Sequence, residues 1–172
     1  MSMVPKGDTA NYLRYGDFVF RQIEILYNMA RMDNAEAHYW LKDNLFQGCC
    51  VDARKKTKYK SKFKGCERTD RKRIQVEWMK YCLNLKYRCN ALFRKDLFDC
   101  KVKQPVEDAT NTKYVSNLFW GAALVEEKKK KYYFGCNVLG KLLKELRENK
   151  GKLKYELPED MHLLGKPIIS NN

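Results

Sequence analysis

Four consecutive lysines, residues 128–131, lie between two short glycine-containing turns at residues 119–121 and 135–137. The second turn ends at Asn137, a residue type that often caps helices, and its glycine lets a ligand approach the backbone closely. Backbone N–H groups at a helix N-terminus bind phosphate well. The first turn contains Trp120, whose indole can stack on a nucleobase. These residue types therefore predict contact with a nucleotide.

The run of lysines allows two interpretations. It can form an exposed loop at the rim of a pocket whose walls are the two turns, where it attracts a polyanionic substrate. It can equally be the solvated tip of a hairpin. In both cases the four side chains lie in water.

The whole chain is strongly basic. Its 172 residues include 35 Lys and Arg against 21 Asp and Glu, which gives a formal net charge of +14 and a pI near 9.4. A positive field of this kind attracts nucleic acid, nucleotides and anionic membrane surfaces. Because 44% of the residues are hydrophobic and 13% aromatic, the chain is not disordered as a whole and can bury a substantial core.

Cysteine, histidine and hydropathy patterns exclude several classes of protein. Seven cysteines occur in a chain whose first residues lack an apolar signal-peptide core, so we expect a reduced, cytoplasmic protein. No CxxC pair occurs and the only histidines are His38 and His162, so we predict neither a metal site nor a cofactor. No run of about 18 apolar residues occurs, so we expect no membrane-spanning helix. The oligomeric state stays open.

Capping and apolar patterns predict the elements of the N-terminal part. Residues 12–27 are rich in aromatic and β-branched residues and partly alternate, which predicts a strand pair or an irregular edge. A cap at residue 33 or 34 starts a helix to about Phe46, which carries Glu36 in its first turn. Residues 51–72 are densely basic and predict a long exposed loop.

Two longer helices follow. Asp70 caps the first, at about residues 71–96, and its apolar residues recur every three or four positions. This predicted stripe consists of Ile74, Trp78, Cys82, Leu85, Cys89 and Leu92. Lys86 flanks the stripe, where a lysine either extends into water or lines a site. The second helix starts at Asn137 and carries its leucines on one side.

Neither a linker nor a repeat divides the chain, which favours a single domain. We place this domain at residues 1–150 and treat residues 151–172 as a C-terminal extension. Three helices with short β elements predict an α+β fold that is mainly α-helical.

Several segments together resemble the NADAR (YbiA-like) family. GCNVLGKLLKELR, residues 135–147, is similar to the family's G-x-N-x-L-G-x-x-L-x-x-x-R ending, and residues 119–121 are similar to its W-G turn. The other similar segments are residues 78–98 (the family's long helix), residues 106–107 (its hydrophobic-Glu element) and residues 35–41 (its first helix). Together these motifs cover about residues 15–149.

The resemblance implies a YbiA-like domain that cleaves an N-glycosidic bond to ribose. The implied substrates are ADP-ribosylated guanine or nucleic acid, or a related nucleotide metabolite. A first-helix glutamate and a lysine would act on the anomeric carbon, the lysine as a nucleophile that forms a Schiff base. The residues expected to be catalytic are Glu36, Lys42, Lys86 and Asn117; those expected to bind substrate are Tyr15, Gly16, Tyr39, Trp120, Gly121, Gly135, Asn137 and Arg147.

Two positions depart from the family pattern. The family lysine lies seven residues after the glutamate, where this chain has Asp43, and Lys42 lies about 120° away around a helix of roughly 100° per residue. The family aspartate before the W-G turn is Asn117, which accepts a hydrogen bond but cannot act as a base. The alternative function is therefore a module that binds ADP-ribose, a nucleotide or nucleic acid without turnover, or a structural subunit.

Overall fold

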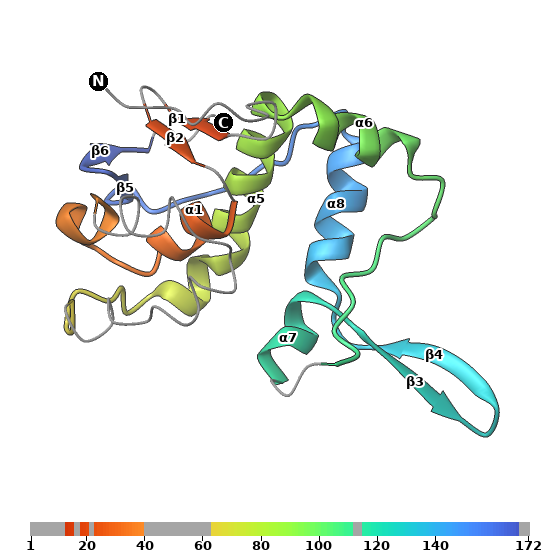
Figure 1. The fold of residues 1–172 in the computed structure, drawn as a ribbon. Coiled ribbons are helices and arrows are strands. Elements are labelled where there is room, and N and C mark those ends of the chain that lie inside the picture. Colours follow the sequence, from red (N-terminus) through yellow and green to blue (C-terminus); the bar gives the residue numbers. More distant parts are fainter. Residues whose placement is uncertain (1–12, 16–17, 21–22, 40–62, 112–114, 169–172) are drawn as a thin grey trace, which may run out of the picture. The chain divides into compact units, whose positions relative to one another are not determined.

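The computed structural model describes residues 13–15, 18–20, 23–39, 63–111 and 115–168. The chain divides into unit 1, residues 1–94 and 154–172, and unit 2, residues 95–153 (Figure 1). In the described part, the strands form three antiparallel pairs and the longer elements are helices. The fold is therefore α+β, as predicted.

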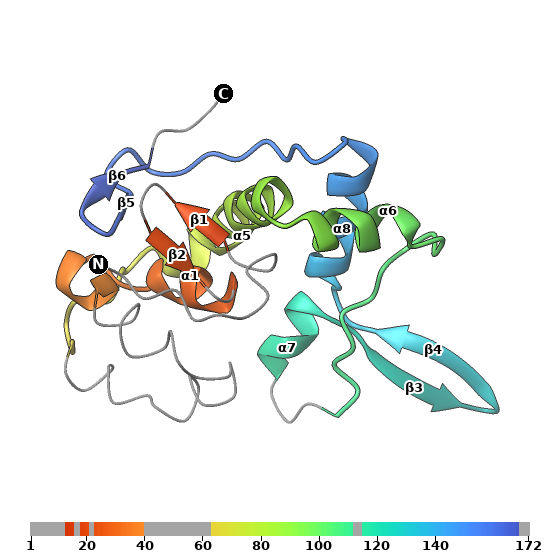
Figure 2. The same cartoon turned by 45° about the horizontal axis from the view of Figure 1, so that its top comes forward.

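Unit 1 contains one long helix and several short elements. These are β1 (Leu13–Tyr15), β2 (Phe18–Phe20), α1 (Ile23–Met29), a helical turn at residues 35–39, α5 (Arg71–Cys89), β5 (His162–Leu163) and β6 (Lys166–Pro167). α6 (Ala91–Asp99) follows α5 and continues into unit 2. α1 packs beside α5, as both views show (Figures 1 and 2).

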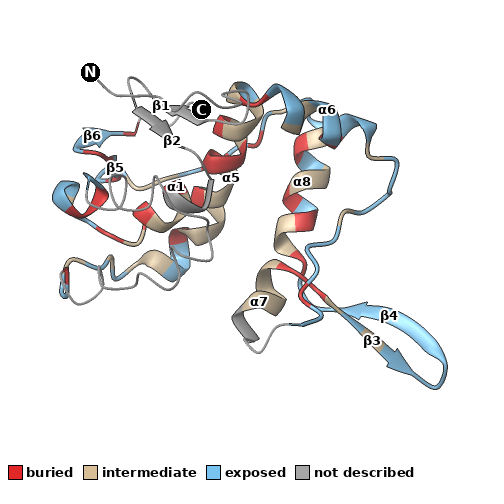
Figure 3. Ribbon diagram, viewed as in Figure 1, coloured by how far each residue is buried: buried red, intermediate tan, exposed pale blue. Residues whose placement is uncertain are grey.

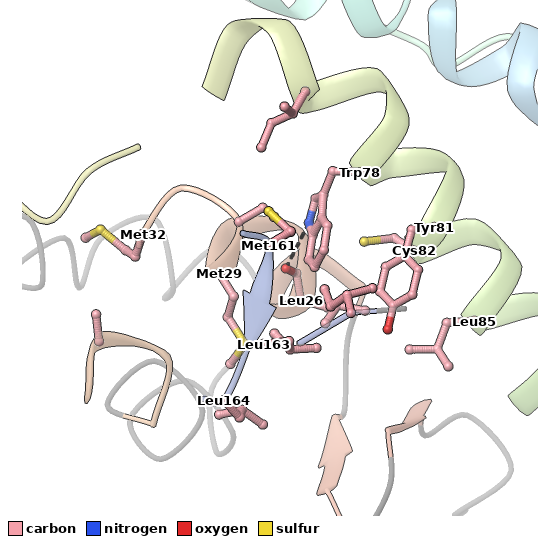
Figure 4. Packing of buried hydrophobic residues seen from close by; sticks show 14 of the residues in the cluster. Leu26, Met29, Met32, Trp78, Tyr81, Cys82, Leu85, Met161, Leu163 and Leu164 are labelled. Carbon is pink, nitrogen blue, oxygen red and sulfur yellow. Dashed lines mark hydrogen bonds between the residues drawn. The ribbon is translucent and has the colours of Figure 1, made fainter. Parts of the chain in front are cut away.

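The core of unit 1 lies where the apolar stripe of α5 meets α1 and the C-terminal segment (Figure 4). The predicted stripe residues that are buried there are Ile74, Trp78, Cys82 and Leu85. The Trp78 indole stacks on Tyr81 with 5.0 Å between ring centroids, and its Nε1–H donates to the Leu26 carbonyl oxygen at 3.2 Å. Because this N–H is satisfied, the indole can be buried without a polar penalty.

The predicted helix over residues 71–96 is interrupted at Asn90. This residue has an extended backbone (φ −119°, ψ 103°), and its Oδ1 accepts the Phe93 N–H at 2.8 Å, which caps α6. The predicted stripe therefore ends near Cys89, and Leu92 is exposed. The prediction of one continuous helix was wrong because periodicity does not register a side chain that competes for backbone hydrogen bonds.

The prediction for residues 12–27 is confirmed only in its first part. β1 and β2 pair antiparallel, with Leu13 opposite Phe20. The following residues form α1, which buries Leu26 and Met29 three positions apart. Short apolar runs do not distinguish a strand from a helix, and here the packing of α1 against α5 determines the helix.

Arg68 joins three segments of unit 1. Asp70 is the N-cap residue of α5 as predicted, but its side chain makes no cap hydrogen bond. Its carboxylate instead accepts hydrogen bonds from Arg68 Nε at 2.9 Å and Nη2 at 3.1 Å. Arg68 also pairs with Asp33 at 3.4 Å and Asp160 at 3.2 Å. The hydrogen bonds from Arg68 lower the pKa of Asp70.

The C-terminal segment beyond residue 153 belongs to unit 1. Tyr155, Met161 and Leu163 are buried, and the Tyr155 ring meets Tyr81 edge-on at 5.6 Å. We expected an appended extension because the apolar residues of this segment follow neither a strand nor a helix period. They nevertheless complete the core, so the segment is part of the unit.

The five cysteines in the described residues carry thiols that form no disulfide with one another. Cys82 lies in the core of unit 1 and is fully buried, as the stripe predicted. Burial raises the pKa of its thiol well above the usual 9.0. Cys82 is therefore a packing residue rather than a nucleophile.

His38 is a buried polar residue of unit 1. Its Nε2 lies 2.9 Å from the carbonyl oxygens of both Met29 and Met32, and its Nδ1 accepts the Leu164 N–H at 3.2 Å. This pattern requires a proton on Nε2 alone, which is the neutral ring. Burial lowers the pKa of His38 below 6.5.

We expect the protein to lose stability as the pH falls below about 6.5, because the unfolded chain then protonates His38 while the folded chain resists it. His38 alone makes the free energy of unfolding fall by up to about 1.4 kcal/mol per pH unit, until the pH passes the lowered pKa of the folded chain. Urea denaturation at pH 7.5, 6.5 and 5.5 measures this change in the free energy of unfolding, and NMR of the imidazole reports the pKa of His38 directly. His162→Gln, at an exposed histidine, should keep the slope; a His38 pKa at or above 6.5 would contradict the prediction.

Unit 2 consists of two helices and a hairpin. These elements are α7 (Val115–Trp120), β3 (Ala123–Glu127), β4 (Lys130–Phe134) and α8 (Val138–Glu148). α8 begins at Asn137 as predicted and buries Leu142 and Leu146. α7 was not predicted: the aromatic turn at residues 119–121 is the end of this short helix.

Candidate functional site

Asn137 connects two distant segments of unit 2. The residue has a left-handed backbone (φ 49°), and its side chain does not cap α8. Instead its Nδ2 donates to the Pro105 carbonyl oxygen at 2.8 Å, and its Oδ1 accepts the Glu107 N–H at 3.1 Å. The side chain is buried, so these bonds hold the segment at residues 105–107 against the start of α8.

Backbone hydrogen bonds bring the two glycine turns together. Asn137 N–H donates to the Gly121 carbonyl oxygen at 3.0 Å, and Cys136 N–H donates to the Leu118 carbonyl oxygen at 2.7 Å. Ala122 N–H donates to the Glu107 carbonyl oxygen at 2.9 Å. The three motif segments at residues 105–107, 119–122 and 135–140 thus form one packed group, which we call the Asn137 cluster.

The glycines of the Asn137 cluster are positions where two backbones touch. A Cβ at Gly121 would lie 2.3 Å from the Glu107 carbonyl oxygen, and one at Gly135 would lie 2.5 Å from the Gly121 carbonyl oxygen. A Cβ at Gly140 would lie 2.1 Å from the Pro105 carbonyl oxygen. Such contacts with backbone atoms cannot be relieved by a side-chain rotation, so any larger residue must separate the segments.

Arg147 makes structural contacts at the other end of α8. Its Nη1 donates to the Cys100 carbonyl oxygen at 2.7 Å and its Nη2 to the Lys103 carbonyl oxygen at 3.3 Å. The backbone N–H groups of Cys136 and Asn137 likewise donate to carbonyl oxygens within unit 2, as described above. Asn137 and Arg147 therefore make the contacts of structural residues in unit 2, and their expected binding of substrate stays a prediction.

Trp120 and Asn117 lie on α7, next to the Asn137 cluster. The Trp120 indole is half-buried and meets Phe119 edge-on at 5.1 Å. The Asn117 carbonyl oxygen accepts the Gly121 N–H at 2.7 Å, which closes the C-terminal end of α7. The indole is therefore partly accessible at the edge of a backbone arrangement that the glycines and Asn137 hold in place.

The other predicted site residues belong to unit 1. Glu36 is exposed in the first turn of the helical segment at residues 35–39, where Asn34 Oδ1 accepts the Ala37 N–H at 3.0 Å and caps the helix. Tyr39 is partly exposed, and its hydroxyl donates to the Leu164 carbonyl oxygen at 3.4 Å. A carboxylate in a first helical turn is stabilised by the helix dipole.

Lys86 lies on α5, and three other predicted residues are not covered by the structure in full. The Lys86 ammonium lies 4.7 Å from the centre of the Phe93 ring, a cation–π distance. Tyr15 ends β1, but its side chain is outside the described residues. Gly16 and Lys42 lie outside them entirely, as does most of the predicted basic loop at residues 51–72.

The structure therefore brings together the unit 2 half of the predicted site. Unit 2 contains Asn117, Trp120, Gly121, Gly135, Asn137 and Arg147. Unit 1 contains Glu36, Tyr39 and Lys86. Sequence reasoning missed Pro105 and Gly140 as members of the Asn137 cluster; a glycine inside an amphipathic helix was the available signal for Gly140.

A cavity of about 790 Å³ lies in unit 1 between α5 and residues 154–158. Its charged lining includes Arg73, Glu77, Lys80 and Lys154. Glu77 pairs with Lys80 at 2.8 Å and accepts the Glu156 N–H at 2.9 Å. No predicted site residue lines this cavity, and the Glu77 carboxylate is already engaged by internal partners.

Comparison of the chain with protein-family models, curated proteins and solved structures gave no match. Within the described residues, no group of three or more His, Cys, Asp or Glu side chains could hold a metal ion. In the same residues, no helix has the length and apolar character needed to cross a bilayer. What bears on function is therefore the set of motif residues and the contacts that they make within each unit.

Proposed function

We propose that this protein hydrolyses an N-glycosidic bond to ribose, in ADP-ribosylated guanine or nucleic acid or in a related nucleotide metabolite. The observation that supports the proposal is the Asn137 cluster. Segments that resemble three separate NADAR motifs are about 15 to 30 residues apart, and direct hydrogen bonds join them through Asn137 and Gly121. Motif residues that resembled the family by chance would have no reason to contact one another.

The proposed reaction uses the residues that the NADAR resemblance assigns to catalysis. Lys42 or Lys86 supplies an amine that attacks C1 of the ribose, the base leaves with its bonding electrons, and Glu36 supplies the proton that the base takes up. The ring C1–O4 bond then breaks, the ring oxygen takes up the proton that the lysine nitrogen gives up, and the open-chain sugar is held as a Schiff base. Water then adds at C1 and restores the free lysine. Trp120 stacks on the substrate, while Asn137 holds the backbone next to the indole through Gly121.

The proposal predicts that Glu36→Gln lowers the rate of ADP-ribose release from an ADP-ribosylated guanine oligonucleotide by at least about 100-fold, since general acid–base groups contribute about 10²–10⁴. Chromatography of released ADP-ribose measures the rate. Glu159→Gln, at an exposed glutamate of the same unit, is the matched control and should keep the wild-type rate. No release by the wild type, or equal rates for both variants, would overturn the proposal.

Borohydride trapping tests the role of the lysine. Reduction during turnover converts a Schiff base to a stable amine, so mass spectrometry should locate ribose on one peptide. Lys42→Ala and Lys86→Ala then show which amine is modified. Turnover without any trapped adduct would exclude the covalent step while leaving hydrolysis itself in place.

The second candidate is a binding module without turnover. It is favoured by Asn117, because its amide cannot replace the carboxylate of the family aspartate. Calorimetry with ADP-ribose, with nucleotides and with RNA distinguishes the two candidates. Binding without release of ADP-ribose supports the module, whereas no release and no binding of any of these ligands excludes both functions.

A further inference from the structure

The β3–β4 hairpin of unit 2 is largely exposed (Figure 3), and several of its exposed residues are aromatic. All five residues of β4 are exposed, and Phe134 retains 61% of its accessible surface, Tyr133 52% and Tyr132 44%. Leu124 on β3 is also exposed. Exposed aromatic side chains next to one another commonly mark an interaction surface rather than a folding requirement.

The strand register divides these side chains between the two faces of the hairpin. Val125 pairs with Tyr132 and Ala123 with Phe134, so Tyr132 and Phe134 share one face. Tyr133 lies opposite Leu124 on the other face. Side chains two positions apart in a strand are separated by about 6.6 Å, which is about twice the 3.4 Å rise per nucleotide of one strand. Each face can therefore offer aromatic rings to nucleobases.

The two lysines at the tip of the hairpin adopt a backbone conformation that is unfavourable for lysine. Lys128 and Lys129 have φ angles of 49° and 65°, the left-handed conformation that asparagine and glycine adopt readily in two-residue hairpin turns. All four lysines of the run are exposed; Lys131 pairs with Glu126 at 3.7 Å, and Lys130 lies opposite Glu127 in the strand register. A turn selected for stability alone would use Asn-Gly, so lysine here points to a role for the charge.

We propose that the β3–β4 hairpin binds single-stranded nucleic acid, with the lysines at residues 128–130 on phosphates and Tyr132, Tyr133 and Phe134 stacked on bases. Single-strand binding typically combines a cationic track with aromatic stacking, and this hairpin carries both. The long-range attraction comes from the net charge of +14. This proposal is independent of the proposed hydrolysis, because an unmodified strand is sufficient for binding.

Two other occupants fit the hairpin less well. An anionic membrane would have to accept Glu126 and Glu127 along with the aromatic rings, and the Glu127 carboxylate is held by the Tyr132 hydroxyl at 3.2 Å. Edge pairing with a second copy is opposed by the lysines of the turn and of the start of β4.

Fluorescence anisotropy with labelled 20-nucleotide single strands of RNA and DNA, and with a DNA duplex, tests the proposal. The wild type should bind the single strands more tightly than the duplex. Tyr133→Ala/Phe134→Ala should weaken single-strand binding by about tenfold or more, since stacking is sequence-tolerant but strong. Phe98→Ala, at an exposed aromatic of the same unit, is the matched control and should bind as the wild type does.

Lys128→Asn/Lys129→Gly separates binding from folding, because this turn sequence favours the hairpin. The slope of log K against log salt should become shallower by about 1.4, or about 0.7 for each phosphate that the variant no longer neutralises. Lys150→Asn/Lys152→Gln removes the same charge elsewhere in unit 2, including a second left-handed lysine, and should leave the slope unchanged.

Several results would overturn the proposal. One is equal binding by the aromatic variant and the wild type. Another is the same salt slope in the two lysine double variants, which would mean that binding depends only on the total charge and not on the position of the lysines. Sedimentation that shows an oligomer lost in the Tyr133→Ala/Phe134→Ala variant, or hairpin-dependent binding to anionic vesicles without single-strand binding, would assign the surface to the other occupants.

Discussion

Gly140→Ala is expected to destabilise unit 2 by about 1–3 kcal/mol, although alanine is normally the better residue inside a helix by about 0.8–1 kcal/mol. At this position alanine is expected to be the less stable residue because its methyl group would lie 2.1 Å from the Pro105 carbonyl oxygen and 2.5 Å from the Asn137 side chain. Relief of this overlap requires α8 to move away from residues 105–107, which strains or breaks the two hydrogen bonds of Asn137.

Urea denaturation followed by tryptophan fluorescence measures this effect. Lys141→Ala changes the next residue of the same helix, where the side chain is exposed, and should shift the free energy of unfolding by less than about 0.5 kcal/mol. A Gly140→Ala variant as stable as the wild type, or more stable, would show that the close approach of Pro105 to α8 does not exist in solution.

Trp78→Ala is expected to destabilise unit 1 by about 3–5 kcal/mol, the usual range for a buried aromatic replaced by alanine. The indole is only 1% exposed and stacks on Tyr81, so its removal leaves a cavity in the centre of the core. The Leu26 carbonyl oxygen also loses its donor. Trp78→Phe should cost less, since a ring remains to fill most of the space.

The same urea experiment distinguishes packing from the hydrogen bond. Phe98→Ala removes an exposed aromatic and should change the free energy of unfolding by less than about 0.5 kcal/mol. If Trp78→Phe proves as damaging as Trp78→Ala, the hydrogen bond to Leu26 matters more than the volume. A Trp78→Ala variant within about 1 kcal/mol of the wild type would contradict the position of the indole in the core.

Local sequence patterns predicted the elements whose periodicity is strong. Four of the six buried residues of α5 belong to the predicted stripe. The start of α8 after Asn137 was also predicted, although the side chain of Asn137 makes no cap hydrogen bond. The break at Asn90 was not predicted, because one side-chain hydrogen bond interrupts an otherwise helical pattern. α1 was missed for a related reason: seven apolar-rich residues are compatible with a strand until their packing partner is known.

The candidate site was predictable as a set of motifs but not as a set of contacts. Asn137 was expected to cap a helix, yet its side chain binds backbone groups about 30 residues earlier in the chain. No spacing rule predicts such a partner, because the two segments meet only after the chain has folded. Likewise, the two turns around the lysines are hydrogen-bonded to each other, so the hairpin-tip interpretation of the lysine run is confirmed.

The closed base of the β3–β4 hairpin makes the intervening residues separable from the rest of unit 2. The Cys136–Leu118 and Asn137–Gly121 hydrogen bonds fasten the chain where it leaves for the hairpin and where it returns. The entropic cost of closing a loop grows only with the logarithm of the number of residues in the loop. Insertions or deletions between residues 123 and 134 should therefore be tolerated by the scaffold, and this arm is a natural position at which to graft a different recognition sequence.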